Sequence, residues 1–441
     1  MSQNNNQPVR RSRRLATIIP ASHWISIGYS QAQATAMEKL QNDIKEYCDS
    51  SGDVNVDLNG RNDNGDTLPH HDMMIPHWKK LATSLSGRTT VEKIELFNIC
   101  LPPPVLDIAF PALQSNLNSL SLANVSLGSD GYRCLSTFLE ENTSLKQLIV
   151  ADDAIDMSVA IPFSDAVRDH PTLENLGLIN CGINNRTILG KLLEGCTKLN
   201  YLGIIMNDLG SEGIALIANF IRSHKTIEYL NLSDENLSDS DASFLASAVK
   251  DNTILKRLDL RDNNITREGE KTLLNVMYDP TSMDSIVDSN HICIPFTYDI
   301  WDSRAISERL FLEQDLLNIN RGSYTVGEKI RKKVVLALCG HGLRYTDVEY
   351  LDISHFNELP LGVMPRVLEL IQEHSESRFK TYRYHDAPIL GSDALSRLFH
   401  TLRGWELPLL FGNLRASSVN EFTGKRKRRK TLVDAEVCRL D

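Results

Sequence analysis

The sequence predicts an α/β solenoid, with parallel strands on one face and helices on the other, followed by a helical cap toward the C-terminal end. Three observations support this fold class. A pattern LxxLxLxxxxL, with Leu, Ile or Val at the marked positions, recurs along the middle of the chain. The recurrence keeps a spacing of 26 or 28 residues, and an amphipathic segment follows most of the copies.

The strands come first in each unit. Copies of the pattern begin at Val91, Leu117, Leu145, Leu173, Leu199, Ile227 and Leu255, with a degenerate eighth copy at Met283. The LxL core of each copy is a short strand, whose two aliphatic side chains point to one side while the residue between them points to the other. One unit can bury its apolar side only against its neighbours, so the units must stack.

The helices come second. Apolar residues recur at helical spacing in 210–221, 238–249 and 266–277. Ser211, Ser238 and Thr266 precede or begin these segments and are expected to cap their N-terminal ends.

This pattern resembles the ribonuclease-inhibitor-like class of leucine-rich repeats over about residues 89 to 293. The resemblance implies a horseshoe that binds partners on its strand-lined concave face. It also implies an Asn or Cys after each strand, which ties neighbouring turns together by hydrogen bonds. In this chain the equivalent residues are Ile99, Val125, Asp153, Cys181, Asn207, Glu235, Asn263 and His291. We therefore expect interruptions wherever neither Asn nor Cys is present.

The segments outside the repeats complete the predicted organisation. Helices are expected over 31–48 and over 75–85, the second covering the first repeat with Trp78, Leu81 and Leu85. Four helical segments at 303–319, 327–340, 363–374 and 393–405 form the expected cap. The predicted divisions are a disordered basic segment 1–30, a helical and linker region 31–88, the repeats 89–299, the cap 300–415 and a basic disordered tail 416–441.

The middle repeats carry the candidate binding surface. Their outward strand positions hold aliphatic and aromatic residues where the flanking repeats are mostly polar, and such clusters tend to mark interaction sites. Gly177 and Gly203 are expected to leave bare backbone as a shallow trough. The residues predicted to contact a partner are Ile149, Ile179, Tyr201, Ile205, Met206, Tyr229, Asn231, Arg257 and Asp259. Two alternatives stay open: a terminal segment of the chain covers the patch, or the strand register is shifted by one.

Catalytic, metal and cofactor sites are not predicted. The stretch 255–269 has the acids and arginines of an acid–base site, but the repeat pattern already places polar residues there. Residues 55–66 imitate a calcium loop, yet Asn opens it and Asp closes it, which favours a solvated linker. His70, His71 and His77 lack the spacing of a zinc site, and the common phosphate-binding and hydrolase motifs are missing.

Charge and composition suggest partners and location. The net charge is −10, but basic runs occur near both ends, and the second is Lys425, Arg426, Lys427, Arg428, Arg429 and Lys430. A nuclear import receptor is the first expectation for this run, with nucleic-acid phosphates or a solubilising tail as alternatives. The acid-free start leaves organelle import open. Eight scattered cysteines and the lack of a long apolar run favour the nucleus or cytoplasm over a membrane.

Together these features predict a non-enzymatic scaffold that binds another protein on the concave face. Two alternatives come from other classes. One is a regulator of a small GTPase, since Ran GTPase-activating proteins share this repeat type. The other is a nucleic-acid-associated adaptor tethered by its basic tail.

Overall fold

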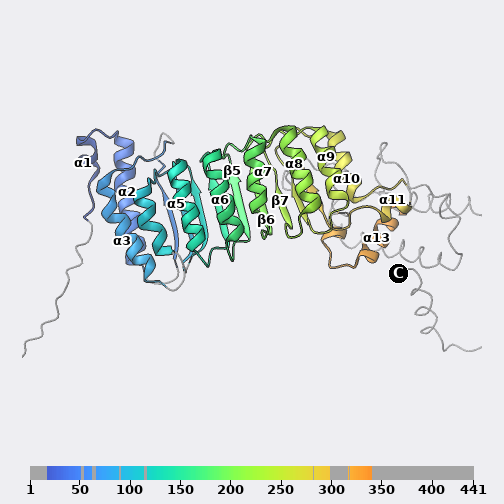
Figure 1. Ribbon diagram of the computed structural model, residues 1–441, viewed down its shortest axis with the longest axis horizontal. Helices are drawn as coiled ribbons and strands as arrows, with labels where there is room; N and C mark the ends of the chain where they lie inside the picture. The colour runs from blue at the N-terminus through green and yellow to red at the C-terminus, as the bar shows by residue number, and fades with distance from the viewer. Residues whose placement is uncertain are drawn as a thin grey trace, which may run out of the picture. The chain divides into compact units, whose positions relative to one another are not determined.

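The computed structural model describes residues 17–50, 54–61, 66–88, 91–113, 117–281, 283–297, 316 and 318–339. The chain divides into two compact units. The first comprises residues 1–277 and 290–305 and contains the whole sheet, and the second comprises 278–289 and 306–441. Figure 1 shows the first unit as strands backed by a row of helices.

The sheet has nine parallel strands in sequence order, without a crossover between neighbours. Their bounds are β1 Val54–Asn59, β2 Val91–Phe97, β3 Leu117–Ala123, β4 Gln147–Ala151, β5 Asn175–Ile179, β6 Tyr201–Ile205, β7 Tyr229–Asn231, β8 Arg257–Asp259 and β9 Ile294–Phe296. This is the predicted α/β solenoid of leucine-rich-repeat type.

A helix separates most neighbouring strands. The helices of the first unit are α1 Ala21–Ser26, α2 Gln31–Asp49, α3 Ile75–Ser86, α4 Pro103–Ala109, α5 Gly128–Glu141, α6 Met157–Asp169, α7 Arg186–Gly195, α8 Gly210–Ser223, α9 Asp239–Lys250 and α10 Arg267–Met277. Short 3-10 helices η1 Asp72–Met74 and η2 Phe110–Leu113 adjoin α3 and α4. In Figure 1, α5 to α10 stand side by side on one side of the sheet.

The core lies between the sheet and these helices. The inward leucines of β3 to β8 are register partners and are at most 1% exposed: Leu120, Leu148, Leu176, Leu202, Leu230 and Leu258. Each contacts the equivalent residue of the next strand, so burial of one repeat depends on its neighbours.

The N-terminal segment is more ordered than predicted. Residues 17–30, expected to belong to a disordered segment, include α1, and Trp24 is fully buried there. Its indole Nε1 donates a hydrogen bond to the Ile19 carbonyl, so the polar atom of this large side chain is satisfied. The predicted helices 31–48 and 75–85 are present as α2 and α3, and Trp78, Leu81 and Leu85 are buried as expected.

The sheet begins one repeat earlier than predicted. Residues 54–59, interpreted as part of a linker that imitates a calcium loop, form β1. Val56 and Leu58 point into the core, and β1 pairs with β2 in parallel. The polar residues of this segment therefore alternate with buried aliphatic residues, as in the other strands.

The end of the sheet also differs from the prediction. Residues Met283–Val287 form helix α11, not the strand of an eighth copy, and the last strand is β9, further along the chain. His291 therefore precedes the last strand and is not the turn equivalent of Asn207 or Asn263. The strand-to-strand spacing lengthens here because an additional helix is inserted.

Two of the three expected N-caps are present. Ser238 forms a capping box with Asp241 at the start of α9, and the Thr266 hydroxyl accepts a hydrogen bond from the Glu268 amide at the start of α10. Ser211 instead lies inside α8, whose N-cap is Leu209. The amide of Leu209 donates to the Glu235 carboxylate.

In the second unit, α13 spans Val326–Cys339 and matches the helix predicted over 327–340. Most of the predicted 303–319 helix, the helices at 363–374 and 393–405, and the basic run Lys425–Lys430 lie outside the described residues. Among the helices that the structure describes, none is both long and apolar enough to span a membrane.

Candidate functional site

The candidate surface is the side of the sheet that faces away from the helices, here called the sheet face. Its side chains form three columns of register partners. The first column runs Gln147, Asn175, Tyr201, Tyr229, Arg257. The second runs Ile149, Gly177, Gly203, Asn231, Asp259. The third runs Phe97, Ala123, Ala151, Ile179, Ile205.

The predicted residues therefore share one face, and the parallel pairing brings them together. Ile149, Ile179, Tyr201, Ile205, Tyr229 and Arg257 are half-buried, and Met206 is 48% exposed. The predicted strand register is correct at these strands. Asn231 and Asp259 differ from the prediction, because their side chains are buried.

The predicted trough of bare backbone is wrong. A side chain at Gly203 would lie 2.9 Å from the Tyr201 hydroxyl, because the ring of Tyr201 extends over this glycine. A side chain at Gly177 would likewise lie 3.4 Å from that of Ile149. Both glycines are buried. They therefore make room for the large side chains of neighbouring positions, and the face there is filled.

Aromatic and cationic side chains meet across β6, β7 and β8. The rings of Tyr201 and Tyr229 lie 4.9 Å apart. The Arg257 guanidinium lies 4.8 Å from the ring centre of Tyr229 and 4.3 Å from that of Phe296, which is on β9. A cation held between two rings is stabilised by their quadrupoles and keeps its charge in a partly apolar setting.

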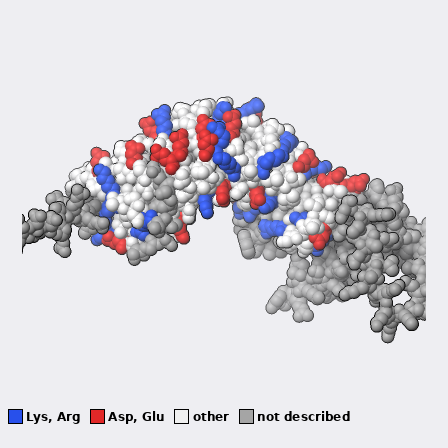
Figure 2. Space-filling view, turned by 60° about the horizontal axis from the view of Figure 1, so that its bottom comes forward, with Lys and Arg blue, Asp and Glu red and all other residues white. Residues whose placement is uncertain are grey.

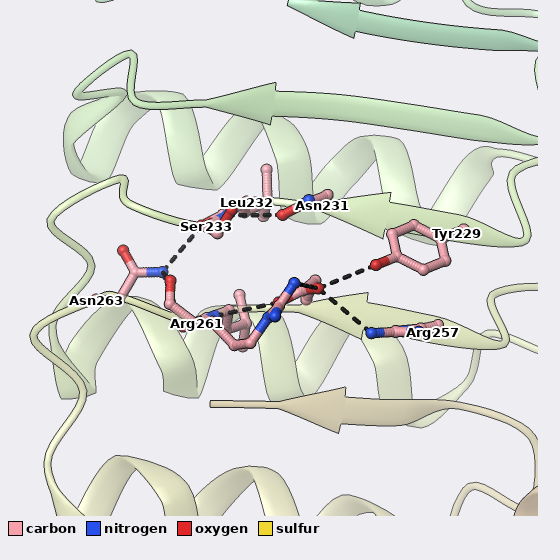
Figure 3. Close-up of polar contacts among 9 residues, drawn as sticks. Tyr229, Asn231, Leu232, Ser233, Arg257, Arg261 and Asn263 are labelled. Carbon is pink, nitrogen blue, oxygen red and sulfur yellow. Dashed lines mark hydrogen bonds and ion pairs between the residues drawn. The ribbon is translucent and has the colours of Figure 1, made fainter. Parts of the chain in front are cut away.

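Asp259 joins this group from below the surface. Its side chain is fully buried, and Arg261 donates to it through Nε at 2.8 Å and through a second nitrogen at 2.9 Å. The Tyr229 hydroxyl donates to the same carboxylate at 2.9 Å, and Arg257 lies 3.6 Å away. Figure 3 shows Tyr229, Arg257 and Arg261 converging on this point between β7 and β8. The carboxylate has two arginine partners, so the group as a whole carries positive charge.

The pKa values of both tyrosines are raised in this group. Burial, together with the negative charge of Asp259, raises the pKa of Tyr229 to about 12. Burial also raises the pKa of Tyr201. Both phenols therefore stay neutral, which keeps the Tyr229 hydroxyl available as a donor to Asp259. Three polar residues of the stretch 255–269, Arg257, Asp259 and Arg261, thus have structural partners in this group.

A turn with a left-handed residue follows the strands. Its φ is between 50° and 60° at Asn98, Asn124, Asp152, Asn180, Met206, Asp234 and Asp262. Asn and Asp tolerate this conformation, whereas a residue such as Met adopts it at a cost of roughly 1 kcal/mol. Among these seven turns, Met206 is the exception, and its side chain is exposed. Local backbone preference therefore does not explain this residue.

The turns that follow Asn124, Asn180, Met206 and Asp234 are each held by a side chain of the next repeat, at the position that was compared between repeats. Asn207 accepts hydrogen bonds from the Cys181 and Ile183 amides, and Asn263 accepts them from Glu235 and Leu237. Figure 3 includes the donation from Asn263 to the Leu232 carbonyl.

The predicted interruptions at Asp153 and Glu235 are wrong. Asp153 accepts from the Val125 and Leu127 amides, one on each oxygen. Glu235 accepts from Asn207 and Leu209 in the same way. A carboxylate can replace an amide here because the turn requires acceptors. Burial raises the pKa of Asp153, and it raises that of Glu235 to about 7.

A second set of side chains, which the sequence analysis missed, holds the turns before β4, β5, β7, β8 and β9. Asn142, His170, His224, Asn252 and Asn290 each accept hydrogen bonds from two backbone amides two and three residues further on. The recurrence of Asn or His shortly before these strands, 28 residues apart from Asn142 to His170 and from His224 to Asn252, could have revealed them.

The histidines near residue 70 have separate roles. His71 accepts from the Met73 amide and packs its ring edge-on against Trp24, while His77 is buried, which lowers its pKa. His70 lies 3.4 Å from Asp72, which is exposed. Within the described ranges, no three His, Cys, Asp or Glu side chains are grouped as metal ligands.

Comparison with known proteins agrees with the fold. No family model matches the sequence. A stretch of 151 residues, 33% of this chain, is 27% identical to the mouse (Mus musculus) protein "NACHT, LRR and PYD domains-containing protein 5". The match covers 13% of that protein, so this chain corresponds to only a small part of its length. The similarity is to a protein with leucine-rich repeats, and such repeats generally mediate protein interactions.

Proposed function

We propose that this chain is a non-enzymatic scaffold that binds another protein through the sheet face of its middle repeats. We also infer that its repeats are of the ribonuclease-inhibitor-like class, because strands and full helices alternate at a spacing near 28 residues. The binding region centres on Ile179, Ile205 and Met206, with Tyr201 and Tyr229 beside them.

The observation that carries the proposal is Met206. It is exposed, and it occupies a left-handed position at which the six equivalent turns after β2 to β8 have Asn or Asp. Met at this site therefore reduces stability without filling the core. Residues that break a local rule without a structural gain tend to serve function. A flexible, polarisable side chain beside Ile205 would suit contact with a partner.

The test compares binding and stability in one substitution. We expect Met206→Asn to raise the free energy of unfolding by about 0.5–1 kcal/mol, because Asn tolerates the positive φ. The same substitution, combined with Ile205→Thr, should weaken partner binding. Partners would be captured by crosslinking to the full chain, identified by mass spectrometry, purified and titrated by calorimetry.

A matched control changes a helix on the opposite side of the sheet. Phe244 in α9 is 52% exposed, and Phe244→Ser should leave partner affinity unchanged. A purified partner that binds the Ile205→Thr, Met206→Asn variant as tightly as the wild type would exclude the sheet face as the binding surface.

A further inference from the structure

The third column of the sheet face forms a continuous apolar row across five strands. It runs from Phe97 on β2 through Ala123, Ala151 and Ile179 to Ile205 on β6. Ala151 is buried and the others are partly exposed. Met206 follows Ile205 directly and extends the row with a more exposed side chain. An apolar strip of this kind can bind the apolar side of another chain.

Carboxylates lie at the carboxyl ends of two strands of this row, β4 and β6, and of the next two strands, β7 and β8. Asp152, Asp208, Asp234 and Asp262 are exposed, and they are defined here as the acidic edge. Asp152 accepts a hydrogen bond from Asn180 at 2.7 Å. Within the part of the chain that the structure describes, none of these four carboxylates forms an ion pair with Lys or Arg. Their negative charge is therefore available to solvent or to a partner.

The opposite edge of the sheet has no such bias. Its turns carry both basic and acidic side chains, and one neighbouring pair, Lys256 and Glu228, is 2.7 Å apart. The exposed residues of this edge include Lys146, Glu174, Lys198, Lys225, Glu228 and Lys256. On the face drawn in Figure 2, charges of both signs are interspersed. Of the two edges of the sheet, the one with Asp152, Asp208, Asp234 and Asp262 is therefore the more acidic.

We propose that the sheet face binds a segment of another protein in which Lys or Arg side chains accompany aliphatic or aromatic ones. This inference rests on the proposed function and names the partner chemistry of the same surface. The apolar side chains contact the row from Ile179 to Met206, and the cationic groups reach the acidic edge. The long stems of Lys and Arg can lie along apolar surface while their charged ends contact carboxylates. An acidic segment is repelled by this edge, since complementary charge determines which partners approach.

The edge can be neutralised without disturbing the backbone. All four aspartates of the acidic edge have positive φ, and Asn occupies such positions at Asn98, Asn124, Asn180 and Asn236. The edge variant therefore combines Asp152→Asn, Asp208→Asn, Asp234→Asn and Asp262→Asn. Its control removes the same charge from exposed positions elsewhere, through Glu92→Gln, Glu140→Gln, Glu174→Gln and Asp251→Asn.

The probe is a random peptide library displayed on phage and selected on the full chain. Enriched peptides would be synthesised, and their affinities measured by fluorescence anisotropy at low and high ionic strength. We expect them to combine basic with apolar residues and to bind the control variant as they bind the wild type. The edge variant should bind them at least about tenfold more weakly at low salt, with a smaller difference at high salt, because exposed charges are screened.

The remaining outcomes separate this inference from the proposed function. Peptides that lose binding to the Ile205→Thr, Met206→Asn variant but are uncharged, or bind the edge variant normally, would overturn the partner chemistry alone. If no enriched peptide depends on Ile205 and Met206, the proposed binding face fails as well. If deletion of 424–441 tightens peptide binding, the chain's own basic run is the occupant, and the inference of a separate partner is wrong.

Discussion

The buried carboxyl of Glu235 gives a sharp test of how the turns are held. Glu235 is 1% exposed, and its two side-chain oxygens accept hydrogen bonds from the backbone amides of Asn207 at 2.8 Å and Leu209 at 3.1 Å. Burial raises its pKa from 4.5 to about 7, against the opposing effect of these two hydrogen bonds. The folded protein therefore holds a proton there in a pH range where the unfolded chain has released it.

The sign and size of the effect follow from linkage. The contribution of this carboxyl to the free energy of unfolding is fully present below pH 4.5 and is lost as the pH rises through about 7. The shift in pKa corresponds to a loss of about 3 kcal/mol over this interval. Glu235→Gln removes the titration and keeps one acceptor oxygen. Its stability relative to wild type should therefore rise by about 3 kcal/mol between about pH 4.5 and pH 7.5.

Urea unfolding of the full chain, followed by circular dichroism at several pH values, measures this difference. Glu268→Gln removes an exposed carboxyl from α10 and serves as the control, whose pH profile should parallel that of the wild type. Parallel profiles for Glu235→Gln and wild type would refute the reasoning, because the carboxyl would then titrate alike in the folded and unfolded states.

Three further predictions concern the polar groups that hold the turns and the face. Burial lowers the pKa of His170 to about 4, so the contribution of this side chain to the free energy of unfolding is present above pH 6.5 and is lost as the pH falls toward 4. Over this pH range, the His170→Asn variant should lose about 3 kcal/mol less stability than the wild type, as measured by acid titration with circular dichroism. Tyr229→Phe removes the donor to buried Asp259 and should cost about 1.5–3 kcal/mol in urea unfolding, whereas Tyr47→Phe, a control whose hydroxyl bonds are exposed, should cost less. Asn252→Ala leaves two backbone amides without their acceptor and should cost about 2–4 kcal/mol, with faster hydrogen exchange at those amides; unchanged exchange would contradict this role.

The central part of the fold could be predicted because the same leucine positions recur in successive repeats of the sequence. The inward leucines of β3 to β8 recur at a regular spacing in the sequence. When the repeats stack, equivalent leucines become register partners on neighbouring strands. The face residues Tyr201, Ile205 and Tyr229 followed from the same phase. Sequence alone therefore identified which residues share the face.

The other parts of the fold and of the candidate site depend on tertiary contacts, which the periodicity of the sequence does not reveal. The strand β1 was missed because its polar residues suggested a metal loop, although Val56 and Leu58 alternate with them. The strand β9 was misplaced because an inserted helix broke the phase. The burial of Asp259 could not be predicted, since it requires Arg261 and Tyr229 to converge from different positions.

Both sets of turn side chains tie a repeat to the one that precedes it in the chain. Asp153, Asn207, Glu235 and Asn263 each hold the turn of the preceding repeat after its strand. Asn252 holds its own turn and donates to the Ile221 carbonyl of the preceding repeat. A middle repeat therefore cannot open alone without releasing bonds on both of its sides. Thermal fraying should start at the ends of the array and advance repeat by repeat, so the slowest hydrogen exchange is expected near β6 and β7.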